Sequence, residues 1–108
     1  MNNMFVIQCD TTKIAIADLT NPGDFLPGTR TITRINVPEA YRGKGFGTAL
    51  LRMITDAADA DGVILSLEIN PSGPLDYDAL RDWYVRNGFY EYSRMAGIYL
   101  RMPEKRNV

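Results

Sequence analysis

The sequence predicts an α/β domain in which a mixed central sheet of about six to seven strands carries two main helices. Three observations support this fold class. Short runs rich in β-branched residues alternate with two segments of helical periodicity, and glycine or proline separates them. The elements follow the order ββ-β-α-β-α-ββ, whose strand–helix–strand part implies a parallel, right-handed crossover. With 108 residues, the chain is expected to form a single domain, 1–108, around one modest core.

The first part of the chain is predicted to supply three strands. The apolar runs Met4–Cys9 and Lys13–Leu19 flank Asp10–Thr12, a pattern that predicts a hairpin. Two Pro-Gly pairs within Thr20–Gly28 indicate a loop. Thr29–Val37 is rich in β-branched residues and is predicted to be a central strand, which a proline ends.

The first helix is predicted from about Phe46 to Asp61, and Gly62 is a natural stop after it. Four apolar residues fall at i, i+3, i+4 and i+7 and are expected to form one buried stripe. These residues are Leu50, Met53, Ile54 and Ala57.

The remaining elements follow in the second half. Val63–Asn70 alternates between apolar and polar residues for most of its length, which predicts a strand. Asp76 or Asp78 could cap a second helix that runs to Asn87. The last hairpin is predicted at Phe89–Arg94 and Gly97–Met102, followed by a loose tail, Glu104–Val108.

Composition excludes several classes of function. The formal net charge is −1, so nothing indicates a partner among nucleic acids or acidic membranes. The sequence shows no secretory signal and no apolar stretch long enough to span a membrane. Cys9 is the single cysteine, which suits a reducing cytoplasm, and histidine is absent. Catalysis by Ser-His-Asp or Cys-His is therefore excluded, as are zinc sites that need histidine or several cysteines, and no metal is expected.

The segment 37–51, VPEAYRGKGFGTALL, predicts an anion-binding turn. Its alternating glycines leave the backbone bare, so that consecutive N–H groups can converge on an anion. A helix then begins and directs its positive dipole end at the same place. Arg42 and Lys44 add positive charge, although either side chain could simply be solvated. A ligand that carries a pyrophosphate is therefore expected.

Two common phosphate loops do not fit this segment. A P-loop requires Gly-Lys-Ser/Thr, whereas Lys44 is followed by Gly45. A dinucleotide fingerprint requires a third glycine where Thr48 stands. A nucleotide hydrolase is disfavoured, because neither a P-loop nor a cluster of metal ligands is visible in the sequence.

Two motifs together resemble the GCN5-related N-acetyltransferase (GNAT) superfamily. RGKGFG at 42–47 matches the pattern Arg/Gln-x-x-Gly-x-Gly/Ala of motif A, whose loop binds the pyrophosphate of acetyl-coenzyme A. DWYVRNGF at 82–89 is similar to motif B, an aromatic-Tyr pair followed by Gly-Phe. The resemblance covers about two-thirds of the chain, Thr29–Pro103.

The resemblance implies acetyl-coenzyme A as the acetyl donor and identifies its expected contacts. The strand end is expected to offer main-chain groups to the pantetheine arm, and the loop to hold the pyrophosphate. The strand residues are Ile35, Asn36 and Val37, and the loop residues are Arg42, Gly43, Lys44, Gly45, Phe46, Gly47 and Thr48.

The resemblance further assigns Tyr84 as the residue that protonates the departing thiolate, with packing beside Trp83 as the alternative. Many relatives carry a glutamate base on the strand Thr29–Val37, which has no carboxylate here. Glu68 on the next strand is the best candidate base, directly or through water. Weaker candidates are Glu39, Asp76 and Asp78. A base is unnecessary if the acceptor amine arrives neutral.

The chain departs from the family at its front. Relatives usually carry one or two helices between their first two strands. In this chain, only Asp10–Thr12 or Thr20–Gly28 could fill that space. A minimal member with an open acceptor side is expected. It would transfer an acetyl group to a primary amine, such as a protein lysine or N-terminus, by direct attack in a ternary complex. The alternatives are a second copy of the chain that completes the site as a homodimer, and a non-catalytic acyl-coenzyme A sensor or interaction module.

Overall fold

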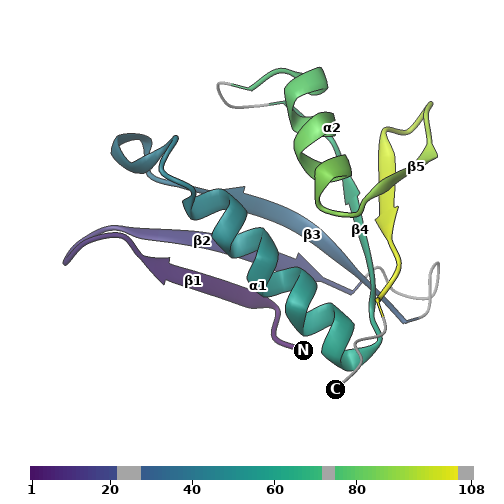
Figure 1. Ribbon diagram of the computed structural model, residues 1–108, viewed down its shortest axis with the longest axis horizontal. Coiled ribbons are helices and arrows are strands. Elements are labelled where there is room, and N and C mark those ends of the chain that lie inside the picture. The colour runs from purple at the N-terminus through teal and green to yellow at the C-terminus, as the bar shows by residue number, and fades with distance from the viewer. Residues whose placement is uncertain (22–27, 72–74, 105–108) are drawn as a thin grey trace.

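The computed structural model describes residues 1–21, 28–71 and 75–104, and it confirms the mixed α/β architecture (Figure 1). Within these ranges, six strands form one sheet in the order β1-β2-β3-β4-β6-β5. Most of the predicted loop 20–28, part of the loop that follows the fourth strand and nearly all of the predicted tail lie outside the described residues.

Every predicted strand and helix is present, and the first helix has the predicted bounds. The strands are β1 (Met4–Gln8), β2 (Ile14–Thr20), β3 (Thr29–Asn36), β4 (Ile64–Glu68), β5 (Tyr90–Ser93) and β6 (Ile98–Arg101). The helices are α1 (Phe46–Asp61), α2 (Tyr77–Arg86) and a short 3-10 turn, η2 (Glu39–Tyr41).

A tight turn joins β1 to β2 at the front of the fold. Asp10 organises it, because one carboxylate oxygen accepts the N–H groups of Thr12 and Lys13, both at 2.7 Å. The N–H of Cys9 also donates to the carbonyl of Lys13 at 2.8 Å. The chain therefore returns directly from β1 into β2, with no helix between the two strands.

Both helices pack on the same face of the sheet. α1 connects the parallel strands β3 and β4, and α2 connects β4 to β5, which also run parallel because both are antiparallel to β6. Since the two crossovers move in the same direction across the sheet, their common handedness places them on one side. Figure 1 shows α1 lying across β1 to β3, and α2 beside β4.

The buried stripe of α1 differs from the predicted one. Met53, which was expected to be buried, is 39% exposed, and Ala57 is only partly buried. The helix lies across several strands and therefore buries a broad face, centred one position away from the predicted stripe. The buried residues of α1 are Leu50, Leu51, Ile54, Thr55 and Ala58.

The ends of the helices follow from particular residues. Gly62 ends α1 with a φ of 67°, a left-handed conformation that glycine adopts without steric cost. Asp76 caps α2, because its carboxylate accepts the N–H of Ala79 at 2.8 Å. Asp78, the alternative cap, lies instead 3.4 Å from Arg81 in an exposed ion pair.

The strands β3 and β4 separate soon after they meet. They pair over three residues, from Thr29 with Ile64 to Thr31 with Ser66, and each then continues without the other. A bulge in the pairing of β2 with β3 lies just beyond, where Thr33 has no partner in the β2 register. Because a bulge bends its strand, it helps to turn β3 away from β4.

Along the described parts of the chain, no helix has the length and apolar character needed to cross a bilayer. The same residues contain no group of three or more His, Cys, Asp or Glu side chains that could hold a metal ion.

A buried ion pair fastens the end of the sheet opposite this separation. Arg101 on β6 is 5% exposed and makes two contacts with Asp59 of α1, at 2.7 and 3.2 Å. Its Nε also donates to the carbonyl of Asn87 at 3.2 Å, where α2 ends. Arg101 thus joins the last turn of α1, the end of α2 and β6.

We expect Arg101→Met to lower the free energy of unfolding by about 3–5 kcal/mol, because it leaves the buried carboxylate of Asp59 without its guanidinium. The control is Arg81→Met on the surface of α2, where exposed ion pairs are worth about 0–1 kcal/mol. Urea unfolding of both variants measures the difference. Equal losses would show that the Arg101 contacts contribute no more than a surface pair.

Candidate active site

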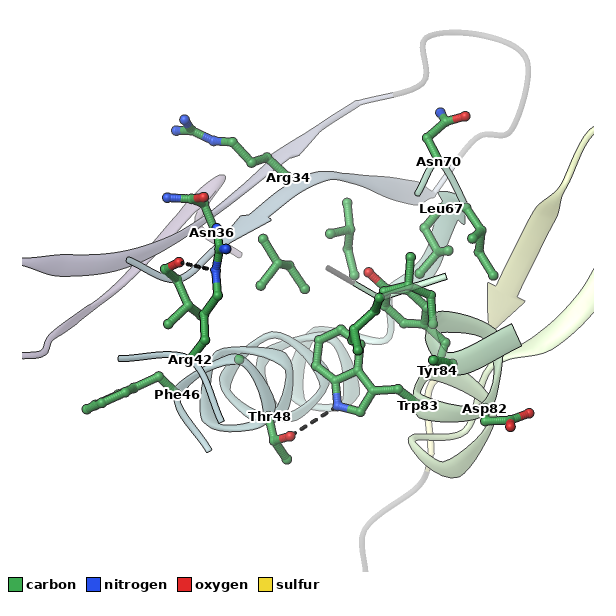
Figure 2. A pocket seen from close by; sticks show the side chains of 18 of the residues that line it. Arg34, Asn36, Arg42, Phe46, Thr48, Leu67, Asn70, Asp82, Trp83 and Tyr84 are labelled. Atoms are coloured by element: carbon green, nitrogen blue, oxygen red, sulfur yellow. Dashed lines mark hydrogen bonds between the residues drawn. The ribbon is translucent and has the colours of Figure 1, made fainter. Parts of the chain in front are cut away.

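The separation of β3 and β4 opens a cleft of about 960 Å³. Its walls come from β3, the loop that leads into α1, the end of β4, and α2 (Figure 2). Segments far apart in the sequence thus contribute to one site, and the first turn of α1 faces α2 across it.

The cleft brings together nearly all of the residues that the sequence singled out. Lys44 is the exception among the predicted ligand contacts, because its ammonium group lies over the Tyr41 ring, 5.6 Å from the centroid, and the residue does not line the cleft. The predicted residues that line it are Ile35, Asn36, Val37, Arg42, Gly43, Gly45, Phe46, Gly47, Thr48, Glu68 and Tyr84.

The start of α1 presents unsatisfied N–H groups to this cleft. Gly45 is the N-cap residue, with a φ of 88° and no side chain to accept a hydrogen bond. No acidic residue lies in the first turn, so its N–H groups and the positive end of the helix dipole are available to an anion. The guanidinium of Arg42 donates to the carbonyl of Val37 at 3.2 Å, which ties the loop to the end of β3.

The β1–β2 turn supports this loop from outside. The hydroxyl of Tyr41 donates a hydrogen bond to the Asp10 carboxylate, and the Tyr41 ring meets Phe46 edge to face at 5.9 Å. The bond from Tyr41, with backbone N–H donors, lowers the pKa of Asp10 to about 2. The contribution of this contact to stability is therefore complete above about pH 4 and is lost only as pH falls through about 2.

Tyr84 extends from α2 into the cleft (Figure 2). Its ring packs against Trp83 at 4.9 Å and against the buried Phe89 at 5.5 Å, so its position is well defined. Burial raises the pKa of the Tyr84 hydroxyl to about 12. The phenol therefore stays protonated near neutral pH and can donate a hydrogen bond into the cleft.

The candidate bases differ in what they contact. Glu68 ends β4, is exposed and lines the cleft, whereas Asp76 is used as the cap of α2. Neither Asp78 nor Glu39 lines the cleft. Among the candidate bases, Glu68 is thus the carboxylate with access to the site.

Sequence reasoning did not assign roles to several residues of the cleft wall. Trp83 donates from its indole N–H to the hydroxyl of Thr48 at 3.0 Å. This contact joins α2 to α1 through two residues that are 35 positions apart in the sequence. Arg34 lines the cleft and pairs with Asp18 on β2 at 2.6 Å. The position of Trp83 directly before Tyr84 was visible in the sequence, but the partners of both residues depend on how the elements pack.

The fold is that of the GNAT acetyltransferases. The profile of the Acetyltransferase (GNAT) domain matches residues 2–91, and the chain therefore belongs to the GNAT family. No curated protein is similar enough in sequence to count as a match.

Solved structures share the fold at low sequence identity. The ribosomal-protein-S18-alanine N-acetyltransferase from Escherichia coli is 21% identical with a TM-score of 0.70, over 99% of this chain and 74% of that protein. An anti-CRISPR protein is 18% identical with a TM-score of 0.62, over 92% and 98%. N-acetylglutamate synthase from Neisseria gonorrhoeae, complexed with coenzyme A and N-acetyl-glutamate, is 18% identical with a TM-score of 0.63, over 84% and 23%.

Substitution by alanine should have opposite effects on stability at Gly45, which precedes α1, and at Gly47, which lies in its first turn. Gly45→Ala should lower the free energy of unfolding by about 1–2 kcal/mol, because an L-residue is strained at a φ of 88°. Gly47→Ala should raise it by up to about 1 kcal/mol, because Gly47 lies within α1 and a methyl group would meet the Trp83 ring at an ordinary 3.7 Å. Denaturant unfolding gives both values. A stable Gly45→Ala variant would contradict the strained geometry of the loop.

Proposed function

We propose that this protein is an N-acetyltransferase that transfers the acetyl group of acetyl-coenzyme A to a primary amine by direct attack in a ternary complex. The observation that carries the proposal is the cleft, which joins the uncapped N-terminus of α1 to the Tyr84 hydroxyl along the unpaired edge of β3. We place the reaction in the cytoplasm, the compartment that a lone cysteine favours.

The residues present suit a pyrophosphate-bearing donor. The N–H groups that follow Gly43 and Gly45 and the dipole of α1 would hold the pyrophosphate. Main-chain groups of Ile35, Asn36 and Val37, beyond the point where β3 leaves β4, would pair with the pantetheine arm as a strand would. Bound in this way, the thioester would lie towards the end of the cleft that Tyr84 borders.

The reaction forms a bond between the amine nitrogen and the carbonyl carbon and breaks the bond between that carbon and sulfur. Positioning of the two reactants supplies much of the rate. A main-chain N–H near Ile35–Val37 would polarise the carbonyl as negative charge develops on its oxygen. An acceptor that arrives as an ammonium ion would first lose a proton to Glu68, directly or through water, whereas a neutral amine needs no base for the attack. In either case the nitrogen loses one further proton as the amide forms, and the departing thiolate takes up a proton to become the thiol.

Tyr84 would stabilise the departing thiolate chiefly by hydrogen bonding. Its pKa of about 12 lies about 3.5 units above the value of about 8.5 for an ordinary thiol. Complete proton transfer to the thiolate would therefore be uphill by about 5 kcal/mol in the ligand-free environment of Tyr84. A phenol that remains protonated can donate a strong hydrogen bond to the sulfur at every working pH.

The acceptor that we propose is an amine on a protein. The direct β1–β2 turn provides no helix to cover the acceptor side, and an enclosed small-molecule site needs walls that bury most of its ligand. A protein lysine or N-terminus brings its own surface to complete the site. The fold accommodates such acceptors, because a neighbour of this fold is a ribosomal-protein-S18-alanine N-acetyltransferase. A second copy of the chain is the alternative source of the missing wall.

Donor binding is tested by comparing Gly45→Glu with Gly45→Ala. Both variants carry the same backbone strain, but only glutamate places a negative charge beside the proposed pyrophosphate site. Calorimetry with coenzyme A should show binding by the wild type, weaker binding by Gly45→Ala, and a further loss of at least about tenfold for Gly45→Glu. Circular dichroism controls for folding. Equal affinities of the two variants would show that the loop is only a turn.

Catalysis is tested with labelled acetyl-coenzyme A and Tyr84→Phe. Wild type should transfer label to protein amines of a cell lysate, and Tyr84→Phe should lower kcat roughly 10²-fold with little change in coenzyme A affinity. Because the Tyr84 pKa is about 12, no alkaline loss of activity from this residue should occur up to about pH 10. Label on small amines alone would contradict a protein acceptor. Tight binding without any turnover would favour the alternative, a non-catalytic acyl-coenzyme A sensor.

A further inference from the structure

Trp83 connects the two helices that face each other across the cleft. Its indole N–H donates to the hydroxyl of Thr48 at 3.0 Å, and Thr48 is the third residue of α1 (Figure 2). The indole also lies against the main chain of that turn, because a Cβ built on Gly47 would meet two ring carbons at 3.7 and 3.8 Å. The same Cβ would lie 3.8 Å from Val37, so the ring, the first turn of α1 and the end of β3 form one packed contact.

This contact matters because α2 has few other attachments. None of its residues is fully buried, in contrast to the broad buried face of α1. Three side chains of α2 besides Trp83 reach the core, namely Tyr77, Leu80 and Tyr84. The hydroxyl of Tyr77 lies 3.4 Å from that of Tyr99, a long contact at the N-terminal end of the helix. Apart from the Arg101 contact with the carbonyl of Asn87 at the base of the helix, the Trp83–Thr48 bond is therefore a main tie between the C-terminal half of α2 and the rest of the cleft.

The same residue is directly linked to Tyr84. The two are neighbours in the chain, and their rings pack at 4.9 Å with an interplanar angle of 45°. A displacement of the indole would therefore carry the Tyr84 ring with it. Thr48 meanwhile belongs to the turn whose N–H groups face the cleft. The Trp83–Thr48 hydrogen bond thus links the proposed pyrophosphate loop to Tyr84, the proposed hydrogen-bond donor to sulfur.

We propose that Trp83 is a positioning residue that fastens α2, and with it Tyr84, to the first turn of α1 through the Trp83–Thr48 hydrogen bond. The proposal rests on the acetyl transfer proposed above. Trp83 acts through Tyr84 and takes no part in the chemistry itself. A turn of α1 that is ordered by a bound anion would hold Tyr84 more firmly, so donor binding and the placement of the hydroxyl would be coupled.

The test is a double-mutant cycle with Trp83→Phe and Thr48→Val. Each removes one partner of the bond, and Phe keeps an aromatic ring against Gly47. Thr48 is exposed, so Thr48→Val should fold. Each single variant should lower kcat at saturating acetyl-coenzyme A by about two- to tenfold, the range for one hydrogen bond. The double variant should fall no further than either single variant. Thr48→Ser keeps the hydroxyl and should restore kcat.

The separation of kcat from KM distinguishes positioning from a simple phosphate contact. If Thr48 only bound phosphate, Thr48→Val would raise the KM for acetyl-coenzyme A, and Trp83→Phe would leave kcat unchanged. That result, or losses of kcat that add in the double variant, would overturn the proposal.

A second readout keeps the test independent of acetyl transfer. In the ligand-free protein, amide hydrogen exchange of Tyr77–Arg86 should accelerate two- to tenfold in each single variant, with no further increase in the double variant. If wild type neither binds coenzyme A nor transfers acetyl groups, the proposed function fails, and this exchange cycle alone decides whether Trp83 fastens α2. Unchanged exchange in all three variants would contradict the fastening.

Discussion

The site depends on one constraint, the early separation of two parallel strands. β3 and β4 are hydrogen-bonded over three residue pairs and then diverge, and β3 continues for five residues and β4 for two beyond that point. Unpaired backbone groups are costly unless water or another partner satisfies them. A sheet that parts in its centre therefore creates a polar edge inside a cleft, next to the apolar side chains of Leu67 and Ile69. Such an edge suits a ligand that can be bound as a strand.

A sheet can part at one end only if it is held at the other. Here the restraint comes from Arg101, whose guanidinium reaches the last turn of α1 and the carbonyl that ends α2. The two crossover helices are thus anchored near their C-terminal ends, whereas at the cleft they meet through the Trp83–Thr48 bond and the packing of the Trp83 ring on Gly47. A buried ion pair thus holds the base of the molecule, whereas an exposed hydrogen bond joins the walls of the cleft. The C-terminal ends of the two helices therefore contribute to stability, whereas the residues that face each other at the cleft belong to the candidate site.

The sequence predicted those features that local chemistry determines. The bounds of α1 follow from its glycines, and the choice of cap for α2 was narrowed to Asp76 and Asp78. The loop before α1 has Gly43 and Gly45 at positive φ, a conformation that their residue type permits without steric cost. Most residues of the first motif and Tyr84 of the second were predicted to lie at one site, and they line the same cleft.

What remained hidden depends on the packing of distant segments. Met53 was misplaced because a repeat of apolar residues gives the period of a helix, but not the direction of its neighbours. Lys44 was expected either at the phosphate or in solvent, because its charge is visible in the sequence, whereas its placement over the Tyr41 ring is not. The Trp83–Thr48 bond depends on two crossovers that bring their helices to the same place. No local sequence pattern predicts that these two helices come into contact.

The turn between β1 and β2 has a further consequence, for the evolution and engineering of this chain. Its two ends are already joined, because Cys9 and Lys13 are bonded through their main chains and Asp10 binds both the turn and Tyr41. A segment inserted between Thr11 and Thr12 would begin and end next to β1 and β2, which are paired as far as Gln8 and Ile14, so the loop-closure entropy would rise only slowly with its length. The β1–β2 turn is thus a place where a new recognition segment could be inserted while β1 and β2 stay paired.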